Sequence, residues 1–137
     1  ELGITASFVG GDGWDSPKLA EIGGGAALNN TYFTNHYSVE DKSPKSRAFV
    51  EAYQKEYGQL PDAMAVLGYD AAYALVDAIK RAGSAEPQKI REALAATKNF
   101  PAVTGDLTLN EKHDAVKSAV IIEMKDGKQV YRETIKP

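Results

Sequence analysis

Residues 8–17 read Phe8-Val9-Gly10-Gly11-Asp12-Gly13-Trp14-Asp15-Ser16-Pro17. The stretch begins as a short apolar run and continues into a glycine-rich turn that carries the carboxylate of Asp12. Glycine adopts positive φ angles at little cost and lets a backbone approach a small ligand closely. Ser16 and Pro17 then have the pattern of a helix N-cap followed by a proline in the first turn. The stretch therefore predicts a strand, a turn whose carboxylate a bound cation could reach, and a helix.

The length and composition are those of one ordinary globular domain. Of the 137 residues, 43% are hydrophobic and 26% are charged, and no apolar run approaches the roughly 20 residues of a membrane-spanning helix. A net charge of −3 gives no broad attraction for nucleic acid or anionic lipid. The chain has no cysteine, which excludes disulfides and zinc thiolate sites. Because it begins at Glu1 without an initiator Met or a signal peptide, we expect a soluble piece of a longer protein.

Hydrophobic periodicity predicts strands and helices in alternation. Strands are expected over residues 4–9 and 31–37, the first of them buried. Helices are expected over residues 17–22 and 44–57, from Pro61-Asp62 to Gly83, and from Pro87 onward. The apolar positions of the long helix, at three- and four-residue spacing, are Met64, Leu67, Ala71, Leu75, Val76 and Ile79.

The C-terminal part predicts short strands. One strand is expected within residues 103–109, and two more over residues 119–124 and 129–134. Asp126-Gly127 lies between the last two, and Asp-Gly tolerates the positive φ angles of a type I′ turn. The chain is therefore expected to end in a β-hairpin.

The residues of the glycine-rich turn each have more than one interpretation. The carboxylate of Asp12 could pair with a cationic ligand group such as an ammonium, or it could bond its own backbone, as turn aspartates commonly do. Trp14 either lines an apolar ligand pocket or packs in the core. Gly11 and Gly13 lack the third glycine of a dinucleotide fingerprint, and no Gly-Lys-Ser/Thr follows, so a nucleotide loop is not predicted.

The remaining polar residues do not indicate catalysis. His36 and His113 lie far apart and lack the spacing of metal ligands, so we expect both to be solvated. Asp70 lies inside the long predicted helix, where a structural hydrogen bond is expected. No Gly-x-Ser-x-Gly elbow, triad spacing or paired-carboxylate pattern occurs. The residues therefore indicate a protein that is not an enzyme, with no catalytic residue, no cofactor and no metal site predicted.

An ordered set of motifs resembles one protein family from about Gly3 to Tyr131. The motifs are Gly10-Gly11-Asp12-Gly13-Trp14-Asp15-Ser16-Pro17, Phe49-Val50-Glu51-Ala52-Tyr53, Pro61-Asp62, Gly68-Tyr69-Asp70-Ala71-Ala72, Val103-Thr104-Gly105 and Lys125-Asp126-Gly127-Lys128. They resemble the C-terminal part of branched-chain amino acid (Leu/Ile/Val) binding proteins, the substrate-binding components of ABC importers. The stretch Gly23-Gly24-Gly25-Ala26-Ala27-Leu28-Asn29-Asn30 departs from the family, in which a more polar sequence is usual.

The resemblance implies an α/β fold, part of a type I periplasmic binding protein. That fold has two lobes, each a flavodoxin-like or Rossmann-like parallel sheet flanked by helices, and here a C-terminal β-hairpin is added. By position, residues 1–37 correspond to the end of the second lobe, and residues 38–114 to the closing part of the first. Residues 115–137 then form the hairpin that returns to the second lobe. The missing N-terminal half, or a second copy of the chain, is expected to be needed to complete the sheets.

The resemblance also implies a function. The intact parent would be a secreted, periplasmic or extracytoplasmic protein that captures an aliphatic amino acid between its lobes and delivers it to a membrane permease. Asp12 matches the family's acidic residue that binds the ligand's ammonium, with Gly11, Gly13 and Trp14 beside it. Met64 matches a residue that contacts the ligand's side chain. The same fold also serves as the ligand-sensing domain of receptors and amide-responsive regulators, which is the alternative.

Overall fold

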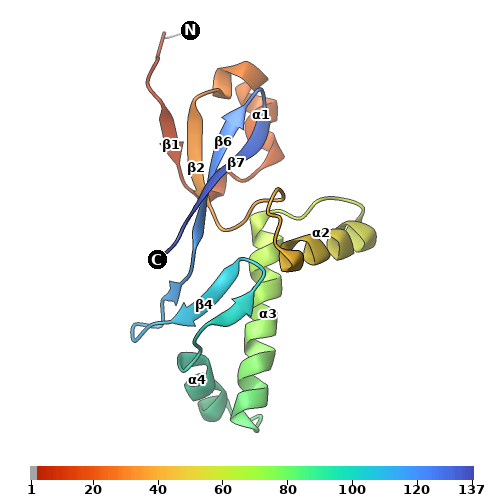
Figure 1. Cartoon of the computed structure of the whole chain (residues 1–137), viewed down its shortest axis with the longest axis vertical. Coiled ribbons are helices and arrows are strands. Elements are labelled where there is room, and N and C mark those ends of the chain that lie inside the picture. The colour runs from red at the N-terminus through yellow and green to blue at the C-terminus, as the bar shows by residue number, and fades with distance from the viewer. Residues whose placement is uncertain (1–2) are drawn as a thin grey trace.

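The computed structural model describes residues 3–137. Figure 1 shows an elongated arrangement of two units, one built on a four-stranded sheet and the other around a long helix. We call them the four-stranded unit, residues 8–35 and 119–135, and the helical unit, residues 44–116. Residues 36–43 and 117–118 are the two crossovers that join them. None of the described helices has the length and apolar character needed to cross a bilayer.

The four-stranded unit combines the two ends of the chain in one sheet. Its strands are β1 (Phe8–Gly10), β2 (Thr31–Asn35), β6 (Ala119–Lys125) and β7 (Lys128–Ile135), in the order β1-β2-β6-β7. β1 pairs parallel to β2, and the other two pairs are antiparallel. The β6–β7 turn has positive φ angles at Asp126 (51°) and Gly127 (75°), which confirms the predicted hairpin.

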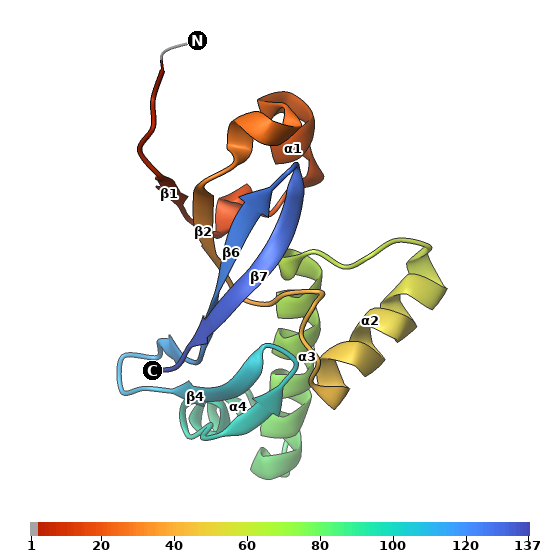
Figure 2. The same ribbon diagram turned by 45° about the horizontal axis from the view of Figure 1, so that its top comes forward.

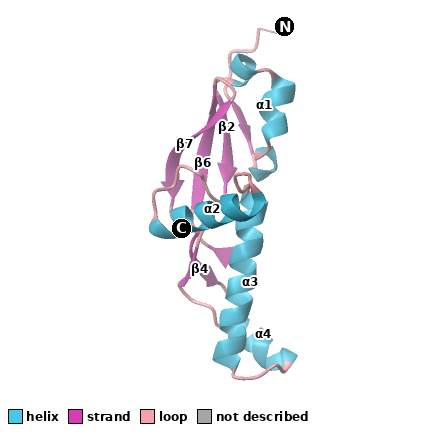
Figure 3. Ribbon diagram, turned by 90° about the vertical axis from the view of Figure 1, so that its right-hand side faces the viewer, coloured by secondary structure: helices cyan, strands magenta, loops and turns pink. Residues whose placement is uncertain are grey.

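Three short helices lie on one face of this sheet. They are η1 (Asp12–Trp14), α1 (Pro17–Gly23) and η2 (Gly25–Leu28), and Figure 3 shows α1 along that face. α1 begins as predicted, because the Ser16 side chain accepts a hydrogen bond from the Lys18 backbone N–H. The core consists of Phe33, Val120, Ile122 and Met124, with Trp14, Leu19, Ala20 and Leu28 packed against it.

The helical unit contains α2 (Pro44–Tyr57), α3 (Ala63–Ala82), α4 (Pro87–Ala95) and a small antiparallel sheet. The strands of that sheet are β3 (Phe100–Ala102), β4 (Gly105–Leu109) and β5 (Ala115–Val116). Figure 2 shows α2 to the right of α3 and β4 to its left, so these two elements lie on opposite sides of the long helix. Ser43 and Asp62 cap α2 and α3 through their side chains, and Gly58 and Gly83 end these helices with positive φ.

The side chain of Asp70 on α3 is hydrogen-bonded to the β3–β4 turn. Its carboxylate accepts hydrogen bonds from the backbone N–H groups of Val103 (2.7 Å) and Thr104 (3.0 Å) and from the Thr104 hydroxyl (2.8 Å). The side chain is buried among these donors. The structural hydrogen bond expected of Asp70 is confirmed. The strand expected within residues 103–109 is confirmed, and it begins at Gly105 because Val103 and Thr104 form the turn before it.

Burial differs from a simple sequence-based expectation in two places, and for the first strand the prediction is wrong. The first strand is shorter than expected and exposed, with Val9 at 76% exposure, because it pairs on one side only, as an edge strand. On α3 the buried positions are Ala63, Val66, Asp70, Ala74 and Ala78. The larger apolar residues at the predicted helical spacing, including Met64, Leu75, Val76 and Ile79, are exposed. α3 packs against α4 and β3, and its larger apolar residues stay exposed among the described residues.

Candidate functional site

The parallel pairing of β1 and β2 brings two polar side chains together. Phe8 pairs with Thr31 and Gly10 with Phe33, so the carboxyl ends of both strands lie at the same edge of the sheet. Asp12 follows β1 by two residues, and His36 follows β2 directly. This edge is where open α/β sheets generally bind ligands. The strand pairing therefore places both residues at a candidate site.

Asp12 and His36 form a hydrogen-bonded pair. Oδ2 of Asp12 lies 3.0 Å from Nε2 of His36, and the two side chains are 48% and 33% exposed. The expectation that His36 is merely solvated is wrong, because its imidazole contacts this carboxylate. Sequence reasoning missed the pair because the residues are 24 positions apart; the position of His36 at the end of the second parallel strand was the available signal.

The glycine-rich turn also contacts the start of α3. Oδ2 of Asp15 accepts a hydrogen bond of 2.8 Å from the backbone N–H of Ala63, while Asp62 caps the N–H of Ala65 at 2.8 Å. Met64 lies between Ala63 and Ala65 in the sequence, and it is 56% exposed. The turn that carries Asp12 and the helix start that carries Met64 are therefore neighbours. Asp15, which sequence reasoning did not select, makes this connection.

Tyr37 holds the segment before α3 in place. Its hydroxyl donates a hydrogen bond of 3.1 Å to the backbone oxygen of Pro61, and its side chain is buried. Burial raises the pKa of Tyr37, and the carboxylates of Asp15 and Asp62 raise it further. Tyr37 therefore stays protonated and remains a donor at physiological pH.

Trp14 lies in a packing position. Its ring lies against Gly10, where an added Cβ would come within 2.5 Å of the indole, and it contacts the core of the four-stranded unit. Gly11 and Gly13 differ, because an added Cβ at either would meet no atom within 4 Å. The backbone at these two glycines is therefore open on the side where a Cβ would lie. The ligand-binding roles of Gly11, Gly13 and Trp14 stay predictions.

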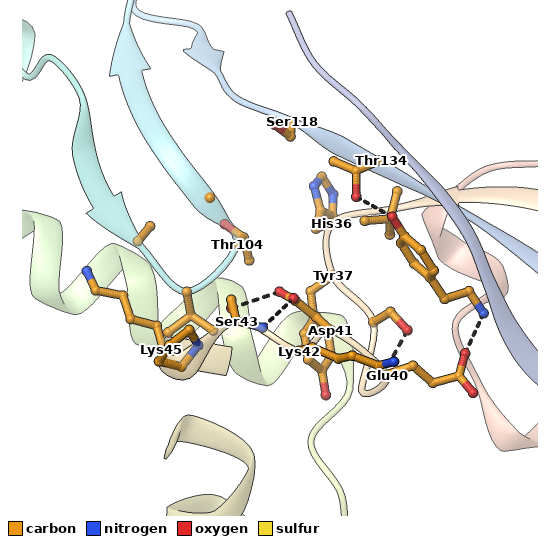
Figure 4. Close-up of a pocket in the computed structure, with 17 residues that line it drawn as sticks. His36, Tyr37, Glu40, Asp41, Lys42, Ser43, Lys45, Thr104, Ser118 and Thr134 are labelled. Atoms are coloured by element: carbon orange, nitrogen blue, oxygen red, sulfur yellow. Dashed lines mark hydrogen bonds between the residues drawn. The ribbon is translucent and has the colours of Figure 1, made fainter. Parts of the chain in front are cut away.

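A cavity of about 730 Å³ lies between the two units. Its walls come from the crossover after β2, the first residues of α2, the β3–β4 turn, Ser118 of the second crossover, and β6 and β7. Figure 4 shows His36 on this wall, together with Ser118 and Thr134. Asp12 and Met64 do not line the cavity. His36 therefore connects the sheet edge that carries Asp12 with the space between the units.

The side chains available in the candidate site suit an organic ligand better than a metal ion. Within residues 3–137, no group of three or more His, Asp or Glu side chains is placed to hold a metal ion. The site instead presents a half-exposed carboxylate, an imidazole and an exposed thioether side chain. Such a combination can hold an ammonium beside an apolar group.

Comparisons with known proteins agree on one family. The sequence profile of the periplasmic binding protein family matches residues 1–129. The Leu/Ile/Val-binding protein homolog 1 of Brucella abortus is 33% identical over 114 residues, which cover 83% of this chain and 30% of that protein. The chain thus spans about a third of the length of the relatives it matches.

Solved structures show the same arrangement. A leucine binding protein of Thermotoga maritima is 42% identical with a TM-score of 0.89, and the match covers 99% of this chain and 39% of that one. A branched-chain amino acid transporter substrate binding protein of Streptococcus pneumoniae, solved with isoleucine, is 33% identical with a TM-score of 0.86 over the same shares. The α/β fold expected from the resemblance is confirmed. This chain belongs to the periplasmic binding protein family.

Proposed function

We propose that this chain is part of a solute-binding protein that captures an aliphatic amino acid and delivers it to an ABC importer. The observation that carries the proposal is the position of Asp12, a half-exposed carboxylate at the carboxyl edge of the parallel strands and beside the start of α3. A carboxylate there can pair with the ligand's ammonium, while Met64 offers apolar contact to an aliphatic side chain. The relatives named for leucine, isoleucine and valine support this ligand class.

The carboxylate of Asp12 also distinguishes between amino acids and aromatic acids as ligands. A solute-binding protein of Rhodopseudomonas palustris, 26% identical, was solved with benzoate. Benzoate has no ammonium, and its carboxylate would be repelled by that of Asp12. The negative charge of Asp12 therefore favours an amino acid, which has an ammonium group, over an aromatic acid that lacks one.

The lobe assignment is part of the same proposal. Residues 1–37 and 115–137 would belong to the second lobe and residues 38–114 to the first. The support is that strands from residues 8–35 and 119–135 share one sheet, while residues 44–116 build the helical unit. The cleft between the lobes would then be bordered by the Asp12 turn on one side and by the start of α3 on the other.

The remaining parts of the proposal concern the whole protein. We place it in the periplasm or another extracytoplasmic space, with a membrane permease as its partner and no enzymatic activity, because its family consists of binding proteins. Among the described residues, the sheet edge at β1 and the apolar residues of α3 have no cover. The missing N-terminal half of the protein, or a second copy of the chain, is proposed to supply that cover.

Calorimetric titration of the full-length protein tests the ligand class. Leucine, isoleucine, valine and phenylalanine are titrated separately, with benzoate as the matched acid that lacks an ammonium. Binding of at least one aliphatic amino acid and none of benzoate is expected. The proposal would be overturned if benzoate alone gave heat of binding. It would also be overturned if no ligand of the set gave any.

A further inference from the structure

The hydrogen bond between Asp12 and His36 has a fixed direction. A carboxylate has only acceptor sites, so Nε2 of His36 must carry the hydrogen and donate it to Oδ2, whether the ring is neutral or protonated. The bond therefore occupies Oδ2 and leaves Oδ1 of Asp12 available to another donor.

The backbone of His36 is held more firmly than the turn that carries Asp12. The backbone N–H of His36 donates a hydrogen bond of 2.7 Å to the side chain of Asn35, which is 3% exposed. Asn35 pairs with Val120 in the middle of the four-stranded sheet. Asp12, by contrast, lies in a three-residue 3₁₀ turn between two glycines. His36 thus has the rigid support needed to fix the orientation of the Asp12 carboxylate.

We propose that His36 is a positioning residue of the amino-acid site, which holds Oδ2 of Asp12 and directs Oδ1 toward the ligand's ammonium. The inference rests on the proposed function and adds a residue that the motifs do not assign. His36 also sets the charge that the ligand meets. A neutral ring leaves the full negative charge on Asp12, whereas a protonated ring cancels it.

Ligand affinity should therefore depend on pH. Histidine side chains ordinarily change charge between about pH 5 and 8. A bound ammonium beside the ring favours the neutral imidazole, so binding releases a proton, and by linkage the affinity falls as the pH falls.

Other titratable groups contact His36, line the same cavity or lie beside Tyr37. They are Asp12 and Asp15 of the turn, Tyr37, Glu40, Asp41 and Lys42 of the crossover, Lys45 of α2, Asp62 at the start of α3 and Tyr131 of β7. Burial raises the pKa of the Tyr37 hydroxyl, which keeps it protonated. A comparison of the wild type with variants of His36 alone therefore assigns a pH effect to the imidazole.

Titration of the full-length protein with leucine at about pH 7.5 and about pH 5.5 tests the inference. The wild-type affinity is expected to fall by about fivefold at the lower pH. His36→Gln keeps an amide donor of similar reach, so it should bind nearly as well at the higher pH and show no fall. His36→Leu removes the donor and should bind roughly tenfold more weakly at both pH values. His113→Gln, in an exposed turn, is the matched control and should follow the wild type.

The outcomes separate this inference from the proposed function. Leucine binding in which His36→Gln keeps the wild-type pH dependence overturns the role of His36 and leaves the amino-acid site standing. The absence of binding for any amino acid overturns both. If His36→Leu proves unfolded by circular dichroism, the comparison of His36→Gln with the wild type decides the question.

Discussion

Asp15 in the glycine-rich turn accepts a hydrogen bond of 2.8 Å from the backbone N–H of Ala63, so a side chain of the four-stranded unit caps a helix of the helical unit. The first N–H groups of a helix have no partner within it, and their aligned dipoles favour a negative charge. Asp62 satisfies one of these groups on α3, and Asp15 satisfies another from across the boundary. The bond therefore couples the position of the Asp12 turn to that of Met64.

Replacing Asp15 with alanine should lower the free energy of unfolding by about 1 kcal/mol, the usual effect of losing a capping side chain. Urea denaturation of the full-length protein measures it. Asp77→Ala is the matched control, because Asp77 makes an exposed ion pair with Arg81 whose loss should cost at most about 0.5 kcal/mol. Equal losses for the two variants would show that the contact with Ala63 adds no stability.

Lys117 should make the free energy of unfolding depend on pH. Burial lowers its pKa, opposed by the carboxylate of Asp70, and its ammonium has no hydrogen-bond partner among the described residues. Because the unfolded chain then holds this proton more strongly, the contribution of Lys117 to stability rises with pH, from the lowered pKa of the folded state toward the ordinary value of 10.5.

Lys117→Met should remove that rise and increase the free energy of unfolding near neutral pH by about 1 kcal/mol, since the methionine carries no charge to bury. Unfolding by urea at about pH 7 and about pH 10 measures both effects. Lys80→Met on the exposed side of α3 is the control, and no change in its pH dependence is expected. Identical behaviour of the two variants would contradict the prediction.

Asp12→Ala in the full-length protein should weaken amino acid binding by about 2 to 5 kcal/mol, because it removes one partner of a charge pair that ligand binding buries. Calorimetry with leucine measures the loss. Asp106→Ala, an exposed carboxylate on β4, should bind as the wild type does. An unchanged affinity in Asp12→Ala would eliminate Asp12 as the ammonium anchor.

Met64→Trp should change which ligands the full-length protein prefers. The larger side chain would fill part of the space proposed for the ligand's side chain, so phenylalanine and leucine should lose more affinity than valine. The ratio of the affinities for valine and leucine is the quantity to compare between wild type and variant. Tyr57→Trp, at an exposed position at the end of α2, provides a control of equal size. An unchanged ratio in Met64→Trp would place Met64 outside the ligand's apolar contacts.

The parts of the fold that could be predicted from sequence follow from local chemistry. Ser16 caps α1, Gly58 ends α2 with a φ of 70°, and Asp126-Gly127 forms the hairpin turn, each as its residue type dictates. Contacts between distant segments could not be predicted in this way. The pairing of β1 with β2 brings His36 to Asp12, and no local pattern encodes that register.

The burial of residues on α3 also depends on contacts with distant segments, so it could not be predicted from sequence. The periodicity of α3 correctly predicted a helix with apolar residues at regular spacing, but not which of them a partner covers. Several of the buried positions are small, such as Ala74 and Ala78, on a helix that packs closely against α4 and β3. Leu75 and Ile79 lie outside that contact and are 43% and 37% exposed.

These exposed residues of α3 lead to the last prediction. If the remainder of the first lobe covers them in the full-length protein, the 137-residue chain leaves an apolar surface open and should self-associate. Leu75→Glu combined with Ile79→Glu should then shift the short chain toward a monomeric mass in light scattering. The same two changes should prevent the full-length protein from folding, because they would bury two carboxylates without partners. A strictly monomeric wild-type short chain, or a full-length double variant that still folds and binds leucine, would show that nothing covers this side of α3 and that the lobe assignment is wrong.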